Sequence, residues 1–236
     1  MMAAIGTFFF QYRNAVFPFA FLLVLLPGPR LFPDALVAAA VGAAIAFLGQ
    51  LVRGLTIGLR YVIRGGKNRR VYAEDLVTDG LYGHTRNPMY VGNLLILAGV
   101  AVASNSWGCV GIAIPLFTFV YIAIVAAEER YLRDKFGDGF AAYTREVPRW
   151  LLRLQGLRAT LAESQFRWRR VLVKEYGTPT GWILGICVIA LWNLWQTEQL
   201  EARANAVEGL IIVMIATALF WLVARALKKS RTLVAD

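Results

Sequence analysis

The chain of 236 residues is 58% hydrophobic and carries a formal net charge of +10. Soluble domains are typically about 45–50% apolar, and the excess here lies in long runs, so the composition argues against a soluble protein. Helices satisfy their own backbone hydrogen bonds in lipid, so we expect an all-α polytopic membrane bundle. The two cysteines, Cys109 and Cys187, stand alone inside apolar runs, and we expect neither a disulfide framework nor a metal site.

Six apolar runs approach the roughly 20 residues that a spanning helix needs. The second run is rich in glycine, which permits close helix packing, and its later half contains Gln50 and Arg53. The third and fourth runs are separated by three residues and are expected to form an antiparallel hairpin, and the fifth and sixth a second hairpin. In chain order the runs cover residues 15–26, 35–59, 89–104, 108–127, 181–195 and 207–224.

The positive charges indicate an orientation, because Lys and Arg concentrate in cytoplasmic loops. If residues 60–86 are cytoplasmic, every Lys and Arg except Arg30 and Arg203 falls on that side, together with both termini. The positive charge then reflects membrane topology, and no nucleic-acid partner is expected. We predict a multi-pass protein, of a bacterial inner membrane, with its active site facing the cytoplasm.

Two segments form the expected cytoplasmic part, residues 60–86 and 128–180. The fourth helix is expected to continue beyond the membrane and end near Gly137, and a short helix ending at Pro148 then folds back under the spans. Residues 158–176 are predicted to form a basic amphipathic helix that lies on anionic lipid. The predicted division is therefore N-terminal membrane helices (1–59), a binding core (60–157), an interfacial helix (158–180) and a C-terminal transmembrane hairpin with a basic tail (181–236).

The segment that precedes the third run is polar and holds the only histidine, His84. Ionisable side chains at a membrane boundary are costly unless they bind something. Asn is a favoured N-cap and Pro a favoured first helical residue, so Asn87 and Pro88 are expected to begin the helix. Its free N–H groups suit an anion, and Arg86 adds a fork for carboxylate or phosphate. The alternatives are a plain helix start and, for Tyr90, a place in an aromatic belt.

Two adjacent carboxylates, Glu128 and Glu129, end the fourth run, where negative charge opposes the helix dipole. Neighbouring residues point about 100° apart on a helix. One carboxylate is therefore expected to face a pocket while the other holds a structural partner such as Arg86 or Arg149. Neutralisation by the arginines that follow them is the simpler alternative. Trp150 is expected to anchor at the lipid headgroups.

Several motifs occur in one order along residues 50–150, and together they resemble the isoprenylcysteine carboxyl methyltransferase and phospholipid methyltransferase superfamily of membrane enzymes. The family has a four-span core, so the last two spans are expected to be an addition to it. The motifs are Leu76-Val77-Thr78-Asp79-Gly80-Leu81-Tyr82, Arg86-Asn87-Pro88-Met89-Tyr90-Val91-Gly92, Glu128-Glu129-Arg130-Tyr131-Leu132, Phe136-Gly137, Phe140, Tyr143 and Val147-Pro148-Arg149.

The resemblance implies S-adenosylmethionine as the methyl donor, bound at the cytoplasmic ends of the third and fourth spans. No glycine-rich fingerprint follows a predicted strand, so no Rossmann domain is expected. The residues expected to bind the cofactor are Gly80, Tyr82, His84, Arg86, Asn87, Pro88, Tyr90, Glu128 and Glu129, and those expected to act in catalysis are Glu129, Arg149 and Tyr143.

The methyl acceptor stays open at this stage. The resemblance favours a lipid or lipidated substrate that enters from the bilayer, either a phospholipid amine or an isoprenylcysteine carboxylate. An amine must lose a proton, for which Glu128 or Glu129 would serve as base through water, whereas a carboxylate would be oriented by Arg149 or Arg86. The alternatives are a small-thiol or small-amine methyltransferase on the same scaffold, an NADPH-dependent sterol-type reductase, and a non-enzymatic membrane protein. The oligomeric state is also open.

Overall fold

The computed structural model describes residues 2–26, 28–60 and 72–230, with side chains described throughout except at residues 13–21. Within these ranges the chain is helical and has no strand, which confirms the expected all-α class. Residues 61–71 of the expected loop and 231–236 of the basic tail lie outside the described residues. The elements are α1 (Met2–Ala20), the 3-10 helix η1 (Phe21–Leu25), α2 (Ala35–Leu59), the 3-10 helix η2 (Gly80–Gly83), α3 (Pro88–Ala103), α4 (Trp107–Glu146), α5 (Leu157–Glu163), α6 (Trp168–Glu175), α7 (Gly177–Gln196) and α8 (Ala204–Lys229).

Four of the expected spans, now α2, α4, α7 and α8, are long and apolar enough to cross a membrane, so this is a multi-pass membrane protein. α3 is apolar but has only 16 residues. The first expected span differs, because the chain is helical from Met2 and tightens into a 3-10 helix at Phe21. The helix starts early because the N-terminal run packs on α4, where Gly6 lies against the Ala123 carbonyl and Phe10 is buried.

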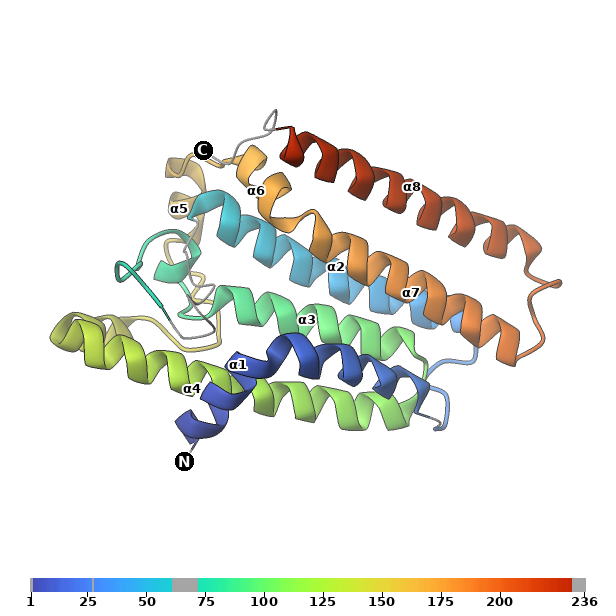
Figure 1. The fold of residues 1–236 in the computed structure, drawn as a ribbon, viewed down its shortest axis with the longest axis horizontal. Helices are drawn as coiled ribbons and strands as arrows, with labels where there is room; N and C mark the ends of the chain where they lie inside the picture. Colours follow the sequence, from blue (N-terminus) through green and yellow to red (C-terminus); the bar gives the residue numbers. More distant parts are fainter. Residues whose placement is uncertain (1, 27, 61–71, 231–236) are drawn as a thin grey trace.

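The helices pack as two central pairs with the C-terminal hairpin along one side (Figure 1). α2 packs along α3, α1 packs along α4, and the expected α3–α4 and α7–α8 hairpins are both present. α7 contacts α2 and α3, whereas α8 lies at the edge of the bundle against α7 and α6. The exposed side of α8 is apolar, as expected for a surface that faces lipid.

Glycines allow α2 and α3 to approach closely. A Cβ atom added at Gly49 would lie 2.5 Å from the Gly92 carbonyl oxygen and 2.8 Å from the backbone nitrogen of Ile96. Gly42 and Gly99 make a second close approach of the same kind, two helical turns away. The expected role of the small residues in the second span is therefore confirmed.

We expect Gly49→Ala to destabilise the protein by about 1–3 kcal/mol, because backbone atoms cannot move aside as a flexible side chain can. Gly111 on α4 is the matched control, since nothing lies within 4 Å of a Cβ added there. Gly111→Ala should be neutral or slightly stabilising, because alanine is the better helix former. Thermal unfolding in detergent checks both variants, and equal midpoints would contradict the close packing.

The bundle has two ends, each named here after a residue at a turn. At the Gly137 end, α4 leaves the bundle, bends at Gly137 (φ 49°, ψ −121°) and continues as a short helix to Glu146, as expected. Phe140 and Tyr143 from this fold-back helix are buried against Ala73 and Leu132. At the opposite or Asn105 end, the chain turns from α3 into α4 through Asn105.

The continuous helix expected over residues 158–176 is wrong, because the structure divides it into α5 and α6. The chain between them crosses the end of α2, where the Arg167 N–H donates to the Gly58 carbonyl at 3.0 Å. The Phe166 ring packs directly on Gly58, and the intervening residues must leave the helix to reach it. Trp168 is exposed, but Glu175 is buried.

Candidate active site

The loop before α3 is held by the backbone conformation of Gly80 and by a hydrogen bond to the Tyr82 carbonyl. Gly80 adopts φ +58°, which favours glycine, and a Cβ there would lie 3.2 Å from the Cβ of Arg60. The buried Tyr82 presents its carbonyl oxygen to the Tyr143 hydroxyl, which donates at 2.7 Å. Gly80, Tyr82 and Tyr143 thus shape the loop and join it to the fold-back helix.

The expected start of α3 is confirmed, with Asn87 just before the helix and Pro88 at its first position. The Asn87 side chain makes no capping hydrogen bond, and its amide instead donates to the Arg149 carbonyl at 3.0 Å. The Arg86 N–H donates to the Pro148 carbonyl at 2.9 Å. Residues 147–160, which we call the strap, are therefore tied to this loop.

His84 is buried and holds the strap with both ring nitrogens. Its Nδ1 lies 2.7 Å from the Arg153 carbonyl oxygen, and its Nε2 lies 2.9 Å from the Thr160 hydroxyl. A carbonyl only accepts, so Nδ1 donates to it, and Nε2 is left to pair with the Thr160 hydroxyl. The Arg153 N–H also donates to the His84 carbonyl at 2.9 Å. The imidazole thus anchors the strap over the loop.

Glu129 binds two arginines. Its carboxylate accepts from Nε of Arg149 at 3.0 Å and from the terminal nitrogen of the same guanidinium, a bidentate pair. A terminal nitrogen of Arg86 lies 3.1 Å from the same carboxylate. The Glu129 and Arg86 side chains are 7% and 14% exposed, whereas that of Arg149 is 43% exposed. The structure therefore makes Glu129 the carboxylate with structural partners.

Glu128 points to a different neighbour, the Tyr90 hydroxyl, which donates to it at 2.5 Å. Glu128 is buried, and the Tyr90 ring lies 5.2 Å from that of Tyr121 on α4. Trp150 packs beside these rings, and its expected place at the lipid headgroups stays a prediction. The two carboxylates thus face different partners, as their 100° offset predicts.

Tyr121 was not singled out from the sequence, although a signal was available. It lies seven residues before Glu128, which places both side chains on one face of α4. One turn farther along each helix, Leu94 and Phe117 line an apolar groove between α3 and α4. The groove therefore continues from the tyrosine pair toward the middle of the bundle.

A second buried polar network lies between α2, α3 and α6. Arg53 donates from Nε to Glu175 at 2.9 Å, forms a second hydrogen bond with the same carboxylate, and donates to the Asn93 side chain. The Gln50 amide donates to Glu175 at 3.1 Å and accepts from the Trp182 indole at 3.3 Å. Gln50 and Arg53, polar residues in an apolar span, were the available sign of a buried partner.

Metal-ligating residues do not gather in the described part of the chain, where no group of three or more His, Cys, Asp or Glu side chains is placed to hold an ion. The side chains of the two linked ion-pair and hydrogen-bond clusters at the Gly137 end are instead two carboxylates, two guanidinium groups and a tyrosine hydroxyl.

The comparisons with known proteins give two kinds of relative. The chain is 30% identical to the cobalt-zinc-cadmium resistance protein CzcN of Cupriavidus metallidurans over 63% of this chain and 62% of that protein. It is 26% identical to the nickel-cobalt-cadmium resistance protein NccN of Alcaligenes xylosoxydans xylosoxydans, over 71% of this chain and 75% of that one. It is 32% identical to a protein-S-isoprenylcysteine O-methyltransferase of Schizosaccharomyces pombe over 31% of each chain.

No solved structure gives a significant match to the chain. The phospholipid methyltransferase family model matches residues 37–139, which contain nearly all of α2, all of α3, Glu128 and Glu129 of α4, and the loop that carries His84. The two protein-S-isoprenylcysteine O-methyltransferases matched, from Schizosaccharomyces pombe and Arabidopsis thaliana, agree with the expected superfamily. Over residues 37–139, somewhat less than half of the chain, this multi-pass membrane protein is similar to the phospholipid methyltransferase family.

Proposed function

We propose that the protein is an S-adenosylmethionine-dependent membrane methyltransferase that binds its donor at the Gly137 end, between α3 and α4. The observation that carries this proposal is the arrangement of Tyr90 with Glu128, next to Arg86 with Glu129. All four residues lie within the family match. Their side chains are buried or half-buried, near the start of α3 and in the part of α4 before its bend at Gly137.

The chemistry of these side chains fits such a donor. S-adenosylmethionine has a carboxylate, an ammonium group and a ribose diol, and when bound it supplies a methyl group on a sulfonium centre. A buried carboxylate such as Glu128 suits the ammonium group or the ribose hydroxyls, and guanidinium groups suit the donor's carboxylate. Arg149 is the more exposed of the two arginines and stands at the solvent side of the cluster.

The protein's own contribution is orientation and exclusion of water. Methyl transfer by direct displacement needs an acceptor held in line with the methyl group, and alignment of this kind supplies much of the rate. The strap, held by His84 and by the amide of Asn87, crosses the loop and limits access of water. In this proposal Gly80, Tyr82, Pro88 and Tyr143 shape the site, and Tyr90, Glu128, Arg86 and Arg149 meet the ligands.

A lipid acceptor is favoured by the apolar groove beside Leu94 and Phe117, which adjoins the tyrosine pair and lies between two membrane helices. A lipid amine would lose its proton to Glu128, directly or through water. A lipid-linked carboxylate needs no base and would be oriented by Arg149. The relatives CzcN and NccN are named for metal resistance rather than for a reaction, so the acceptor is identified by assay.

The test is methyl transfer by purified protein in vesicles, with S-adenosylmethionine labelled in its methyl group. Phosphatidylethanolamine, a farnesylated cysteine and a small thiol are offered separately. The proposal expects label in one of the two lipidic acceptors and much less with Glu128→Gln. Label in the thiol alone would favour the small-molecule alternative. No transfer, together with oxidation of NADPH by the same preparation, would favour the reductase and overturn the proposal.

A further inference from the structure

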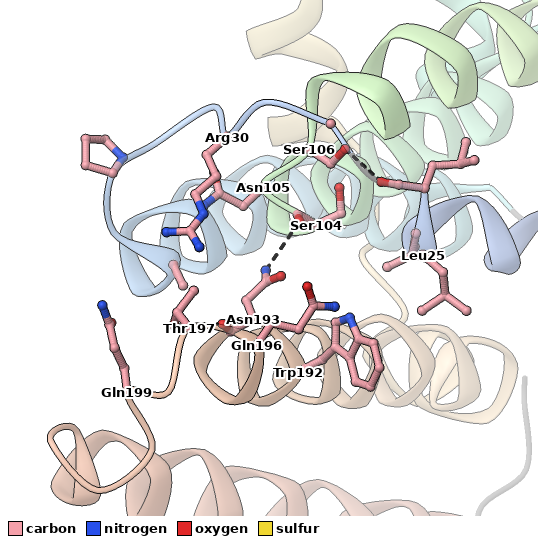
Figure 2. Close-up of a pocket in the computed structure, with 15 residues that line it drawn as sticks. Leu25, Arg30, Ser104, Asn105, Ser106, Trp192, Asn193, Gln196, Thr197 and Gln199 are labelled. Atoms are coloured by element: carbon pink, nitrogen blue, oxygen red, sulfur yellow. Dashed lines mark hydrogen bonds between the residues drawn. The ribbon is translucent and has the colours of Figure 1, made fainter.

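A polar pocket lies at the Asn105 end, the opposite end of the bundle from the candidate active site (Figure 2). Its walls are the loop before α2, the α3–α4 turn and the last turn of α7. α7 lies outside residues 37–139, so the C-terminal hairpin adds this pocket to the family core. The polar side chains that line it are Arg30, Ser104, Asn105, Ser106, Asn193, Gln196, Thr197 and Gln199.

The walls of the pocket are fixed by hydrogen bonds. The Asn105 side chain accepts from the Phe32 N–H at 2.8 Å and donates to the Phe32 carbonyl at 3.0 Å. The Ser106 hydroxyl donates to the Leu26 carbonyl at 2.8 Å. The Asn193 amide, on α7, donates to the Ser104 carbonyl at 3.3 Å and so joins the hairpin to the turn. The pocket is therefore a built feature rather than a loose gap.

The remaining lining groups are mostly donors. The side chains of Arg30, Gln196 and Gln199 form no hydrogen bond or ion pair with any described residue. Figure 2 shows Arg30 extending from its loop toward the end of α7, where Thr197 and Gln199 lie. A guanidinium group beside free amides is the donor set that recognises an oxyanion.

The described lining of the pocket has no carboxylate that would repel an oxyanion from these donors. Among the described residues that line the pocket there is no Asp or Glu. Two acidic residues, Asp34 and Glu198, are next to lining residues in the sequence. Asp34 accepts from the Leu36 N–H at 2.7 Å and is ion-paired with Arg203 at 2.8 Å, so its charge is matched. Glu198 is exposed and does not line the pocket, so neither carboxylate takes the charge of Arg30.

The other side of the pocket is apolar and partly exposed. Val24, Leu25 and Trp192 line it, and Leu25 and Trp192 are 57% and 40% exposed. The pocket lies where α3 and α7 end and α2 begins, which is the level at which spanning helices leave the bilayer. A headgroup can therefore occupy the polar part while its chains follow the apolar side.

We propose that this pocket binds a phosphate oxyanion, carried by a phospholipid headgroup or by free phosphate, with Arg30 as its main ligand and Gln196 and Gln199 as further donors. The site is separate from the proposed methyl-transfer site, and its occupancy is measured without reference to activity.

The experiment is native mass spectrometry of the detergent-purified full chain, titrated with phosphatidylglycerol. We expect one most tightly bound lipid, and Arg30→Gln should weaken its binding about tenfold, because a charge-assisted hydrogen-bond pair is lost. Gln196→Leu should weaken it less. Arg145→Gln removes the same charge from an exposed arginine at the Gly137 end and should leave the binding unchanged.

Two competitors separate the sources of the phosphate. Diacylglycerol with the same chains tests the apolar contribution, and inorganic phosphate tests the oxyanion alone. Displacement of the lipid by millimolar inorganic phosphate would support the site and identify soluble phosphate as a sufficient ligand. Equal competition by diacylglycerol, or unchanged lipid binding by both Arg30→Gln and Gln196→Leu in folded protein, would overturn the proposal.

Discussion

Glu129→Gln is expected to lower the free energy of unfolding by about 2–4 kcal/mol, because it leaves Arg86 without its carboxylate in a largely buried position. The Glu129 side chain is 7% exposed and is the shared partner of Arg86 and Arg149. Glutamine keeps the shape and one hydrogen-bond acceptor but removes the charge. Because the Arg149 side chain is 43% exposed, water partly replaces the carboxylate that it loses. Most of the destabilisation should therefore come from Arg86.

This variant is measured by thermal unfolding in detergent beside Glu163→Gln, which changes an exposed carboxylate on α5 and should leave the midpoint unchanged. The same reasoning ranks the two arginines, since Arg86→Gln should cost more stability than Arg149→Gln. A Glu129→Gln variant that unfolds at the wild-type temperature would contradict the structural role assigned to this carboxylate.

Glu175→Leu is expected to cost about 3–5 kcal/mol, which is the usual result of removing one partner of a buried ion pair. It leaves Arg53, whose side chain is 12% exposed, without the carboxylate that it binds through two nitrogens. Glu175 also joins α6 to α2, so docking of the C-terminal hairpin should weaken. The measurement is chemical unfolding in mixed micelles, and Glu198→Gln, in the exposed turn after α7, is the control.

The double variant Arg53→Met with Glu175→Leu distinguishes an uncompensated charge from simple loss of packing. Buried ion pairs replaced by apolar side chains of similar volume are often no less stable than the pair. The double variant should therefore recover more than half of the stability that Glu175→Leu loses. A loss equal to the sum of the two single losses would show that the two side chains act independently.

Local signals in the sequence predicted much of the fold. Pro88 begins α3 and Gly137 ends the straight part of α4, because the conformation of each residue is restricted or permitted by its own chemistry. The apolar runs likewise predicted the spans. The early start of α1 was missed because it depends on packing of Gly6 against α4 rather than on local preference.

The partners of the polar residues were harder to predict, because they come from distant parts of the chain. The sequence offered Arg86 or Arg149 as alternatives for one glutamate, and the structure gives both to Glu129. The role of His84 at the cofactor stays a prediction, and the sequence did not indicate that both its ring nitrogens contact the strap, about 70 residues later. Glu175 lies in a basic segment, and its partners on α2 depend on the packing of α6 against α2, which no local signal in the sequence indicates.

The most direct test of the account is calorimetric titration of S-adenosylmethionine and S-adenosylhomocysteine into the detergent-purified protein. We predict that the wild type binds both, and that Tyr90→Phe and Glu128→Gln bind at least about tenfold more weakly while each stays folded, because each loses a charge-assisted hydrogen bond at the donor site. Wild-type protein that is folded and binds neither compound would contradict the proposed donor site and the methyltransferase function with it.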